Sequence, residues 1–201
     1  MKTQVIQNQI QGQTIKDAYI AIELKTATIV KGLQETLREA LKSQGVQCED
    51  ASATLHVSIA YTEGTVTVSE VAAAARKIAN ETFKVNVGHY EILEGKMTPY
   101  DYLVISLNSD GDFENAVEIV EDQMVTRRFE GGFKSHVSLL RFEKGTLALA
   151  LMKLMIRELN ASQGAAQALG RSVCLEGSKV CVFDPQRQCR VQIPFLADLA
   201  A

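Results

Sequence analysis

Alternating apolar and polar side chains predict a set of β-strands in this chain. Residues 55–61 and 133–142 show the alternation most clearly, because β-branched and aromatic residues there alternate with smaller or polar ones. Each such strand presents one apolar face to a core and one polar face away from it. Further strands are predicted at residues 18–24, 83–93 and 102–107, and in a C-terminal meander of residues 171–176, 179–184 and 188–195.

Apolar residues at helical spacing predict four helices between these strands. The predicted helices span residues 28–43, 70–80, 113–127 and 146–161. Ser69 and Asp112 are the expected N-caps of the second and third helices, because their short polar side chains can accept hydrogen bonds from free backbone amides. In chain order the elements divide into two βα-type halves, each with one of the two alternating strands.

The composition is that of a globular protein, with 46% hydrophobic and 22% charged residues among 201. This length suffices for a sizeable core, and no linker rich in Pro, Gly or Ser interrupts it. We expect a polar leader at residues 1–17 and a single domain at residues 18–201. The net charge of −3 argues against a broad basic surface that would bind long duplex nucleic acid.

We expect a cytoplasmic protein with reduced cysteines and no membrane contact. Residues 1–13 are polar and glutamine-rich, and the longest apolar run, residues 147–156, is interrupted by Lys153 and is too short for a bilayer. The cysteines lack paired C-x-x-C spacing and are Cys48, Cys174, Cys181 and Cys189. A turn at residues 177–178 would set Cys174 opposite Cys181 in the wider kind of antiparallel pair, so no disulfide is expected.

One short motif occurs in both alternating strands, as His56-Val57-Ser58-Ile59 and His136-Val137-Ser138-Leu139. The alternation places the histidine and the serine of each copy on one face and the apolar residues on the other. If the two strands lie side by side, both imidazoles and both hydroxyls line one cleft. By the same alternation, Tyr61 and Arg141 point to the opposite face.

Two imidazoles and two hydroxyls suit displacement at phosphorus. An attacking oxygen must lose a proton and the leaving oxygen must gain one, and an imidazole with a pKa of about 6.5 can do either near neutrality. The serine hydroxyls would donate hydrogen bonds to the non-bridging oxygens, which carry the negative charge. This chemistry requires no metal or other cofactor.

Other interpretations of these residues remain open. A single histidine on a strand is commonly a hydrogen-bonded structural residue, and we expect this of His89. Residues 108–112 faintly resemble a calcium loop, but they lack the twelve-residue set that ends in a glutamate, so a turn with Asp112 as helix cap is the better interpretation. A metal site on the two histidines is a weak alternative, since no H-E-x-x-H or other close ligand grouping accompanies them.

The motifs, with their flanking residues His56-Val57-Ser58-Ile59-Ala60-Tyr61 and His136-Val137-Ser138-Leu139-Leu140-Arg141, resemble the two-histidine (2H) phosphoesterase superfamily. The resemblance extends over residues 18–195. It implies a two-lobed α+β fold with a pseudo-twofold axis, in which antiparallel sheets line a central cleft and helices lie outside. It further implies catalytic roles for His56 and His136, phosphate binding by Ser58 and Ser138, and substrate contacts for Tyr61 and Arg141.

From this resemblance we expect a metal-independent phosphodiesterase that acts on a 2',3'-cyclic phosphate or a 2'-5' phosphodiester. The expected substrate is a nucleotide, a cyclic nucleotide or a short RNA end, and the protein is expected to be a monomer. Two alternatives share the same cleft. One is a nucleotide-binding module without turnover, and the other is a viral-type phosphodiesterase that degrades cyclic or 2'-5' oligonucleotide signals.

Overall fold

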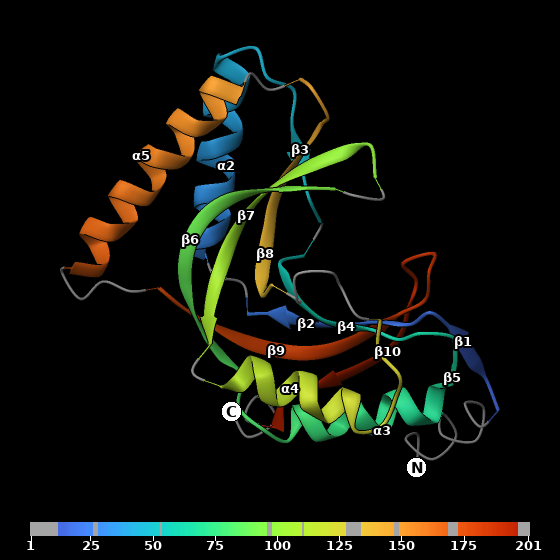
Figure 1. Cartoon of the computed structure of the whole chain (residues 1–201). Coiled ribbons are helices and arrows are strands. Elements are labelled where there is room, and N and C mark those ends of the chain that lie inside the picture. Colours follow the sequence, from blue (N-terminus) through green and yellow to red (C-terminus); the bar gives the residue numbers. More distant parts are fainter. Residues whose placement is uncertain are drawn as a thin grey trace.

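An antiparallel sheet that closes on itself organises the molecule (Figure 1). The structure is a computed structural model that describes residues 12–25, 28–52, 54–95, 98–109, 111–127, 134–146, 149–168 and 173–196. The strands are β1 (Thr14–Lys16), β2 (Tyr19–Leu24), β3 (Glu49–Asp50), β4 (His56–Tyr61), β5 (Thr65–Thr67), β6 (Lys84–Glu94), β7 (Tyr100–Ser109), β8 (His136–Glu143), β9 (Cys174–Phe183) and β10 (Cys189–Pro194). The helices are α2 (Thr28–Ser43), α3 (Val68–Ala79), α4 (Asp112–Glu121) and α5 (Leu149–Ala168).

The main sheet has the strand order β10-β9-β2-β4-β8-β7-β6, and β3 pairs with β8 outside this path. Strand β9 also pairs with β6, so the strands from β9 to β6 form a closed ring, and β10 lies outside it on β9. The two strands that carry the repeated motif, β4 and β8, meet in the middle at the pair Val57 and Val137. This arrangement confirms the predicted α+β fold with antiparallel strands and helices outside.

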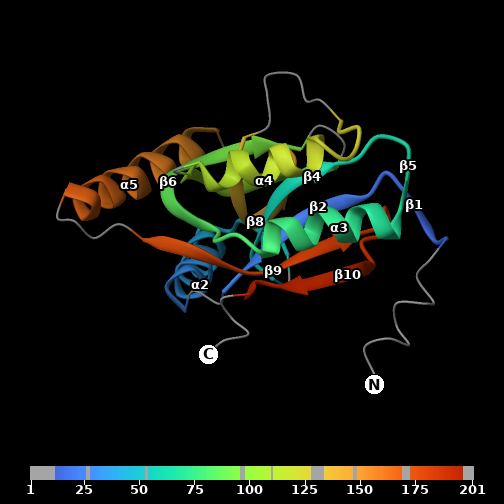
Figure 2. The ribbon, with the colours of Figure 1, turned by 90° about the horizontal axis from the view of Figure 1, so that it is seen from below.

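The sheet and its helices form two lobes. The His56 lobe contains β2, β4, β9 and β10 with α3 and α4, and the His136 lobe contains β3, β6, β7 and β8 with α2 and α5. Figure 2 shows α3 and α4 side by side on one face of the His56 lobe. Helix α2 follows β2 in sequence but packs against β8 of the other lobe. The lobes therefore exchange helices and do not correspond to the two chain-order halves.

Apolar packing and a buried glutamine connect α2 to the other lobe. The Gln34 side chain is buried, and its Nε2 donates a hydrogen bond of 2.8 Å to the Leu139 carbonyl oxygen in β8. On the same helix, the side chains of Val30, Leu37 and Leu41 are buried in the hydrophobic core. Burial of these apolar side chains holds α2 in place, and the Leu139 carbonyl, which also accepts from the Ala51 amide, gives the buried glutamine a hydrogen-bond partner.

The N-cap residues of α3 and α4 differ from the two that were predicted. Thr67, not Ser69, caps α3, because Glu70 lies three residues after Thr67 and completes a capping box with it. Gly111 caps α4 at a φ of 99°, a left-handed conformation that glycine adopts without steric cost. The Asp112 carboxylate instead accepts a hydrogen bond from the Lys84 amide, so it connects α4 to the start of β6.

Two helix ends and one leader boundary also differ from the sequence pattern. Helix α4 ends at Glu121, not at residue 127, because the following segment pairs with the end of β4 through Arg127 N to Tyr61 O and a Thr62–Thr126 bridge. Helix α5 continues to Ala168. In the expected leader, Thr14–Lys16 form β1, which pairs with β5, and residues 1–11 lie outside the described residues.

Strand β9 corrects the prediction of a C-terminal hairpin turn. Residues 174–183 form one continuous strand, so Cys174 and Cys181 lie on the same strand and not across a turn. All four cysteines are free thiols. A Cβ atom on Gly177 would lie 2.7 Å from Phe195 Cε2 and 3.0 Å from Ile22 Cγ2. Close packing of β9, and not a turn, requires this glycine.

Replacement of Gly177 by valine is expected to destabilise the protein by about 1–3 kcal/mol, because the added atoms overlap with Phe195 and Ile22. Urea unfolding, followed by circular dichroism, measures this change. Gly32→Ala is the matched control, since Gly32 lies in α2 with open space around it and alanine should stabilise the helix by about 0.5–1 kcal/mol. An unchanged unfolding midpoint for Gly177→Val would contradict the packing argument.

Candidate active site

The register between β4 and β8 brings the four predicted groups of the two motifs together. Val57 pairs with Val137 in an antiparallel arrangement, which sets His56 opposite Ser138 and Ser58 opposite His136. Both valines are fully buried and face the core. The two histidines and two serines therefore share the opposite face, and a local twofold axis passes through the valine pair. We call this face the cleft face.

Both imidazoles are held in the same way by a backbone carbonyl two residues earlier. His56 Nδ1 lies 3.0 Å from the Thr54 oxygen, and His136 Nδ1 lies 2.7 Å from the Lys134 oxygen. A carbonyl oxygen can only accept, so each Nδ1 carries a hydrogen and donates it. This fixes the ring orientation and, in the neutral form, leaves the lone pair on Nε2. Each ring can thus accept or donate a proton through Nε2.

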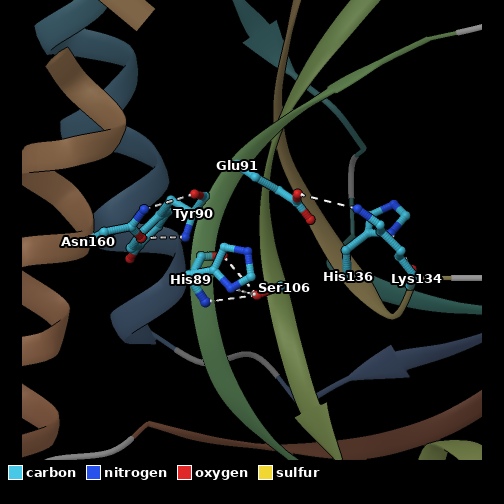
Figure 3. A network of polar contacts seen from close by, with 7 residues as sticks. All are labelled: His89, Tyr90, Glu91, Ser106, Lys134, His136 and Asn160. Carbon is cyan, nitrogen blue, oxygen red and sulfur yellow. Dashed lines mark hydrogen bonds and ion pairs between the residues drawn. The ribbon is translucent and has the colours of Figure 1, made fainter. Parts of the chain in front are cut away.

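The two histidines have different charged neighbours. Burial lowers the pKa of His56, and the Arg187 guanidinium and His136 lower it further, against the Thr54 hydrogen bond and Glu23. Burial also lowers the pKa of His136, but here the Lys134 hydrogen bond and the Glu91 carboxylate act in the opposite direction. Figure 3 shows the Glu91 side chain extending from β6 toward Lys134 and His136, and its carboxylate lies 3.9 Å from Lys134 Nζ. The His56 ring therefore has a cation, Arg187, among its charged neighbours, whereas the charged neighbour that acts on His136 is the anion Glu91.

The two serines also differ in their partners. The Ser58 hydroxyl lies 2.7 Å from the hydroxyl of Tyr19 on β2. Burial raises the pKa of the Tyr19 phenol far above its ordinary value, so the phenol keeps its proton and can donate it to Ser58 Oγ. The hydrogen of Ser58 is then available to a ligand. In the described part of the chain, the Ser138 hydroxyl has no hydrogen-bond partner.

A β-bulge in each motif strand reverses the expected direction of Tyr61 and Arg141. In β4 the partners change from Ser58–Ala21 to Ala60–Ile20, which leaves one extra residue. In β8 the same change occurs between Ser138–Val104 and Leu140–Leu103. An extra residue shifts the alternation by one position. The prediction from strict alternation is therefore wrong, and both side chains return to the cleft face.

Tyr61 and Arg141 nevertheless have different surroundings. The Tyr61 ring stacks on Tyr19 with the ring centroids 4.7 Å apart, and Tyr19 also stacks on Phe183 at 5.6 Å. Arg141 is engaged away from the imidazoles, because its Nη2 lies 2.6 Å from a Glu49 carboxylate oxygen and its guanidinium lies over Tyr100. Tyr61 joins an aromatic cluster beside His56, whereas Arg141 forms an ion pair at the far end of β8.

Arg187 is a cleft residue that the sequence did not indicate. Its guanidinium lies over the Tyr19 ring, 4.5 Å from the centroid. The positive charge also interacts electrostatically with His56 and Tyr61. It comes from the turn between β9 and β10 at a φ of 61°, where its amide donates to the Asp184 oxygen. The buried Asp184 carboxylate accepts from Gln188 N and from Arg190, and these bonds hold its pKa below the ordinary value although burial would raise it. Asp184 thus fixes the turn that presents Arg187.

The described ranges contain neither a metal-ligand cluster nor a membrane-spanning helix. No group of three or more His, Cys, Asp or Glu side chains there could hold a metal ion. In the calcium-like segment, Asp110 lies outside the described residues and Asp112 is bonded to the Lys84 amide. None of the helices in the described ranges has the length and apolar character needed to cross a bilayer.

Known proteins resemble this chain in structure rather than in sequence. No protein-family model matches it, and no curated protein matches it significantly. Usb1 of Kluyveromyces marxianus is 14% identical, with a TM-score of 0.56 over 90% of this chain and 98% of that chain. A structure of the same Usb1 with uridine monophosphate is 13% identical, with a TM-score of 0.56 over 89% and 98%. TT0787 of Thermus thermophilus is 12% identical, with a TM-score of 0.53 over 89% and 97%.

These likenesses establish the fold. Usb1 and TT0787 belong to the 2H phosphoesterase superfamily, and the match covers nearly the full length of each chain. The fold that the repeated motif predicted is therefore confirmed as that of the 2H phosphoesterases.

Proposed function

From the 2H phosphoesterase fold of this chain, we propose that it is a phosphodiesterase whose reaction depends on His56 and His136. The observation that carries the proposal is the matched anchoring of both rings, each by Nδ1 to the carbonyl two residues earlier on adjoining strands. The same anchoring leaves both Nε2 atoms available on one face. A structural histidine pair would not require two identical orientations around a twofold axis.

In the proposed reaction, one imidazole accepts a proton from water or from a neighbouring ribose hydroxyl. The oxygen of that water or hydroxyl attacks phosphorus at the same time. The bond from phosphorus to the leaving oxygen breaks, and the second imidazole donates a proton to that oxygen. The Ser58 and Ser138 hydroxyls donate hydrogen bonds to the non-bridging oxygens through the transition state. Arg187, beside His56, adds positive charge near the same oxygens. These protein groups account for every proton transfer without a metal.

A nucleotide with a 2',3'-cyclic phosphate or a 2'-5' linkage is the substrate class that we favour. Usb1, which has this fold, has been solved with uridine monophosphate. The half-buried Tyr61 ring, which is supported from behind by the buried Tyr19 ring, offers a flat surface to a base. The net charge of −3 gives no broad basic face, which favours a small nucleotide or a short RNA end over a long duplex.

A panel of substrates tests this function directly. The purified protein is incubated, with EDTA present, with 2',3'-cyclic mononucleotides, 2'-5' oligoadenylate, 3'-5' linked RNA and cyclic dinucleotides, and the products are identified by mass. We expect turnover of at least one of the first two classes, and we expect it to persist in the chelator. Binding without any product would identify a nucleotide-binding module, and activity that only added metal restores would refute the mechanism.

We further propose that His136 is the general acid and His56 the general base. The Glu91 carboxylate stabilises a protonated His136, whereas the Arg187 cation disfavours a second positive charge on His56. A base must be neutral before the reaction, and an acid must hold its proton. The charged neighbours therefore match His56 to the first role and His136 to the second.

The dependence of kcat/KM on pH is expected to follow this assignment. Because burial lowers the pKa of both rings, the maximum should lie below the ordinary imidazole pKa of about 6.5. Arg187→Gln should raise the pKa of His56, so the acidic limb moves to higher pH. Glu91→Gln should lower the pKa of His136, so the basic limb moves to lower pH.

These shifts show which ring has the lower pKa. The assignment of acid and base needs a substrate whose leaving group requires no proton. A diester with a 4-nitrophenolate leaving group gives a second measurement, since this group departs without protonation. His136→Asn should lose much less activity on this substrate than on a nucleotide, and His56→Asn should lose similar activity on both.

A further inference from the structure

The third histidine of the chain is built into the cleft face by a bulge in β6. Val87 pairs with Leu107 and Tyr90 pairs with Ile105, so Gly88 and His89 together lie opposite Ser106 on β7. A Cβ atom on residue 88 would lie 2.6 Å from Ser106 Oγ. Only glycine at position 88 lets β6 approach Ser106 this closely.

Ser106 holds the His89 residue from both its backbone and its ring. The His89 amide donates to Ser106 Oγ at 2.8 Å, and His89 Nδ1 lies 2.8 Å from the same oxygen (Figure 3). Ser106 Oγ also lies 3.0 Å from the His89 carbonyl oxygen. The ring is therefore anchored through Nδ1, as the rings of His56 and His136 are. In the described part of the chain, His89 Nε2 has no partner.

The position of His89 relates it to His136. Ser106 pairs directly with His136 across β7 and β8, so both side chains lie on the same face. Strand β6 lies two strand spacings, about 10 Å, from β8. Tyr90, the next residue, is bonded through its amide and its carbonyl to Asn160 of α5, which fixes this part of β6 (Figure 3). His89 is exposed, so a ligand beside His136 can reach it.

We propose that His89 forms a second phosphate subsite on the His136 side of the cleft, for the phosphate carried by the leaving nucleotide of an oligonucleotide substrate. This inference rests on the proposed function. The His56 side offers the half-buried Tyr61 and Phe183 rings, both stacked on the buried Tyr19 ring, which suit a base. The His136 side offers an anchored imidazole with a free ring nitrogen, which can donate to a phosphate oxygen when protonated. The two lobes would thus bind chemically different ends of one substrate.

Selectivity between two substrates tests the subsite. They are a 2'-5' linked diadenylate and the same diadenylate with an additional phosphate on its leaving nucleotide. The wild-type protein should favour the phosphorylated form, and His89→Asn should reduce the ratio of the two kcat/KM values roughly tenfold or more, as expected for loss of a charged hydrogen bond. His89→Lys should restore the ratio, because lysine supplies a cation at the same place. Lys84→Gln, an exposed change on the same strand, is the matched control.

Equilibrium binding separates failure of this inference from failure of the proposed function. If no diester is turned over, calorimetric titration of the same two ligands still measures the preference for the additional phosphate and its loss in His89→Asn. An equal loss of affinity for both ligands, or a preference unchanged in His89→Asn, would overturn the subsite. A loss that His89→Lys does not rescue would assign His89 a purely structural role.

Discussion

Replacing either cleft histidine by asparagine is expected to reduce kcat by roughly 10²–10⁴-fold, the usual contribution of one proton transfer. Asparagine approximates the imidazole in size and can donate to the same backbone carbonyl, but it cannot carry a proton between oxygens. His56→Asn removes the proposed base and His136→Asn the proposed acid. Initial rates on the best substrate of the panel, at the optimal pH, measure the effect.

Three controls separate lost chemistry from lost structure. Both variants should unfold within a few degrees of the wild-type protein, because each ring lies on the cleft face and the adjoining Val57 and Val137 hold the core. The double variant should lose less than the product of the single losses, since the two rings serve one reaction. EDTA should leave the wild-type rate unchanged. A His56→Asn or His136→Asn variant with full activity would refute the mechanism.

The repeated motif predicted correctly which of its side chains share a face, because that depends only on local geometry. Side chains two residues apart on a strand point to the same face. The alternation alone therefore predicted that the histidine and the serine of each motif share one face. The separation of the two copies did not determine that they adjoin. That came from the resemblance to a known superfamily, and the Val57–Val137 pair agrees with it.

The bulges show where alternation fails. In both motif strands the extra residue falls within a pair of adjacent apolar residues, Ile59-Ala60 in β4 and Leu139-Leu140 in β8. All four are buried, so the apolar pair itself was the available signal that the alternation shifts. A regular strand would have exposed one residue of each pair. The hydrophobic cost of that exposure favours the bulge, which returns Tyr61 and Arg141 to the cleft face.

Residues that reach the site from other strands could not be predicted. Tyr19, Glu91 and Arg187 each approach a motif residue because of strand pairing or a turn far away in the sequence. The turn predicted at Gly177 was wrong for a similar reason. A Gly-Ser pair usually marks a turn, and only the tertiary contacts with Phe195 and Ile22 explain a glycine in the middle of β9.

Removal of either cleft hydroxyl is expected to cost roughly 10²-fold in kcat. Ser58→Ala and Ser138→Ala each delete one hydrogen bond to the phosphoryl oxygens, and donors of this kind stabilise the transition state more than the bound substrate. Ser58→Thr and Ser138→Thr should keep most of the activity, because threonine retains the hydroxyl at the same position. Alanine variants as active as the wild-type protein would remove the serines from the mechanism.

The hydrogen bond between Tyr19 and Ser58 gives this prediction a test that distinguishes the two sides of the cleft. We propose that Tyr19 is a positioning residue: its buried, protonated phenol can donate to Ser58 Oγ, which directs the serine hydrogen to the substrate. Tyr19→Phe should therefore cost roughly tenfold in kcat in the wild-type background. It should cost almost nothing more in Ser58→Ala, where the oriented hydroxyl is already absent, but its full effect should remain in Ser138→Ala. Equal effects of Tyr19→Phe in both serine variants would show that the Tyr19 hydroxyl does not act through Ser58, and would point to its other polar neighbour, Arg187.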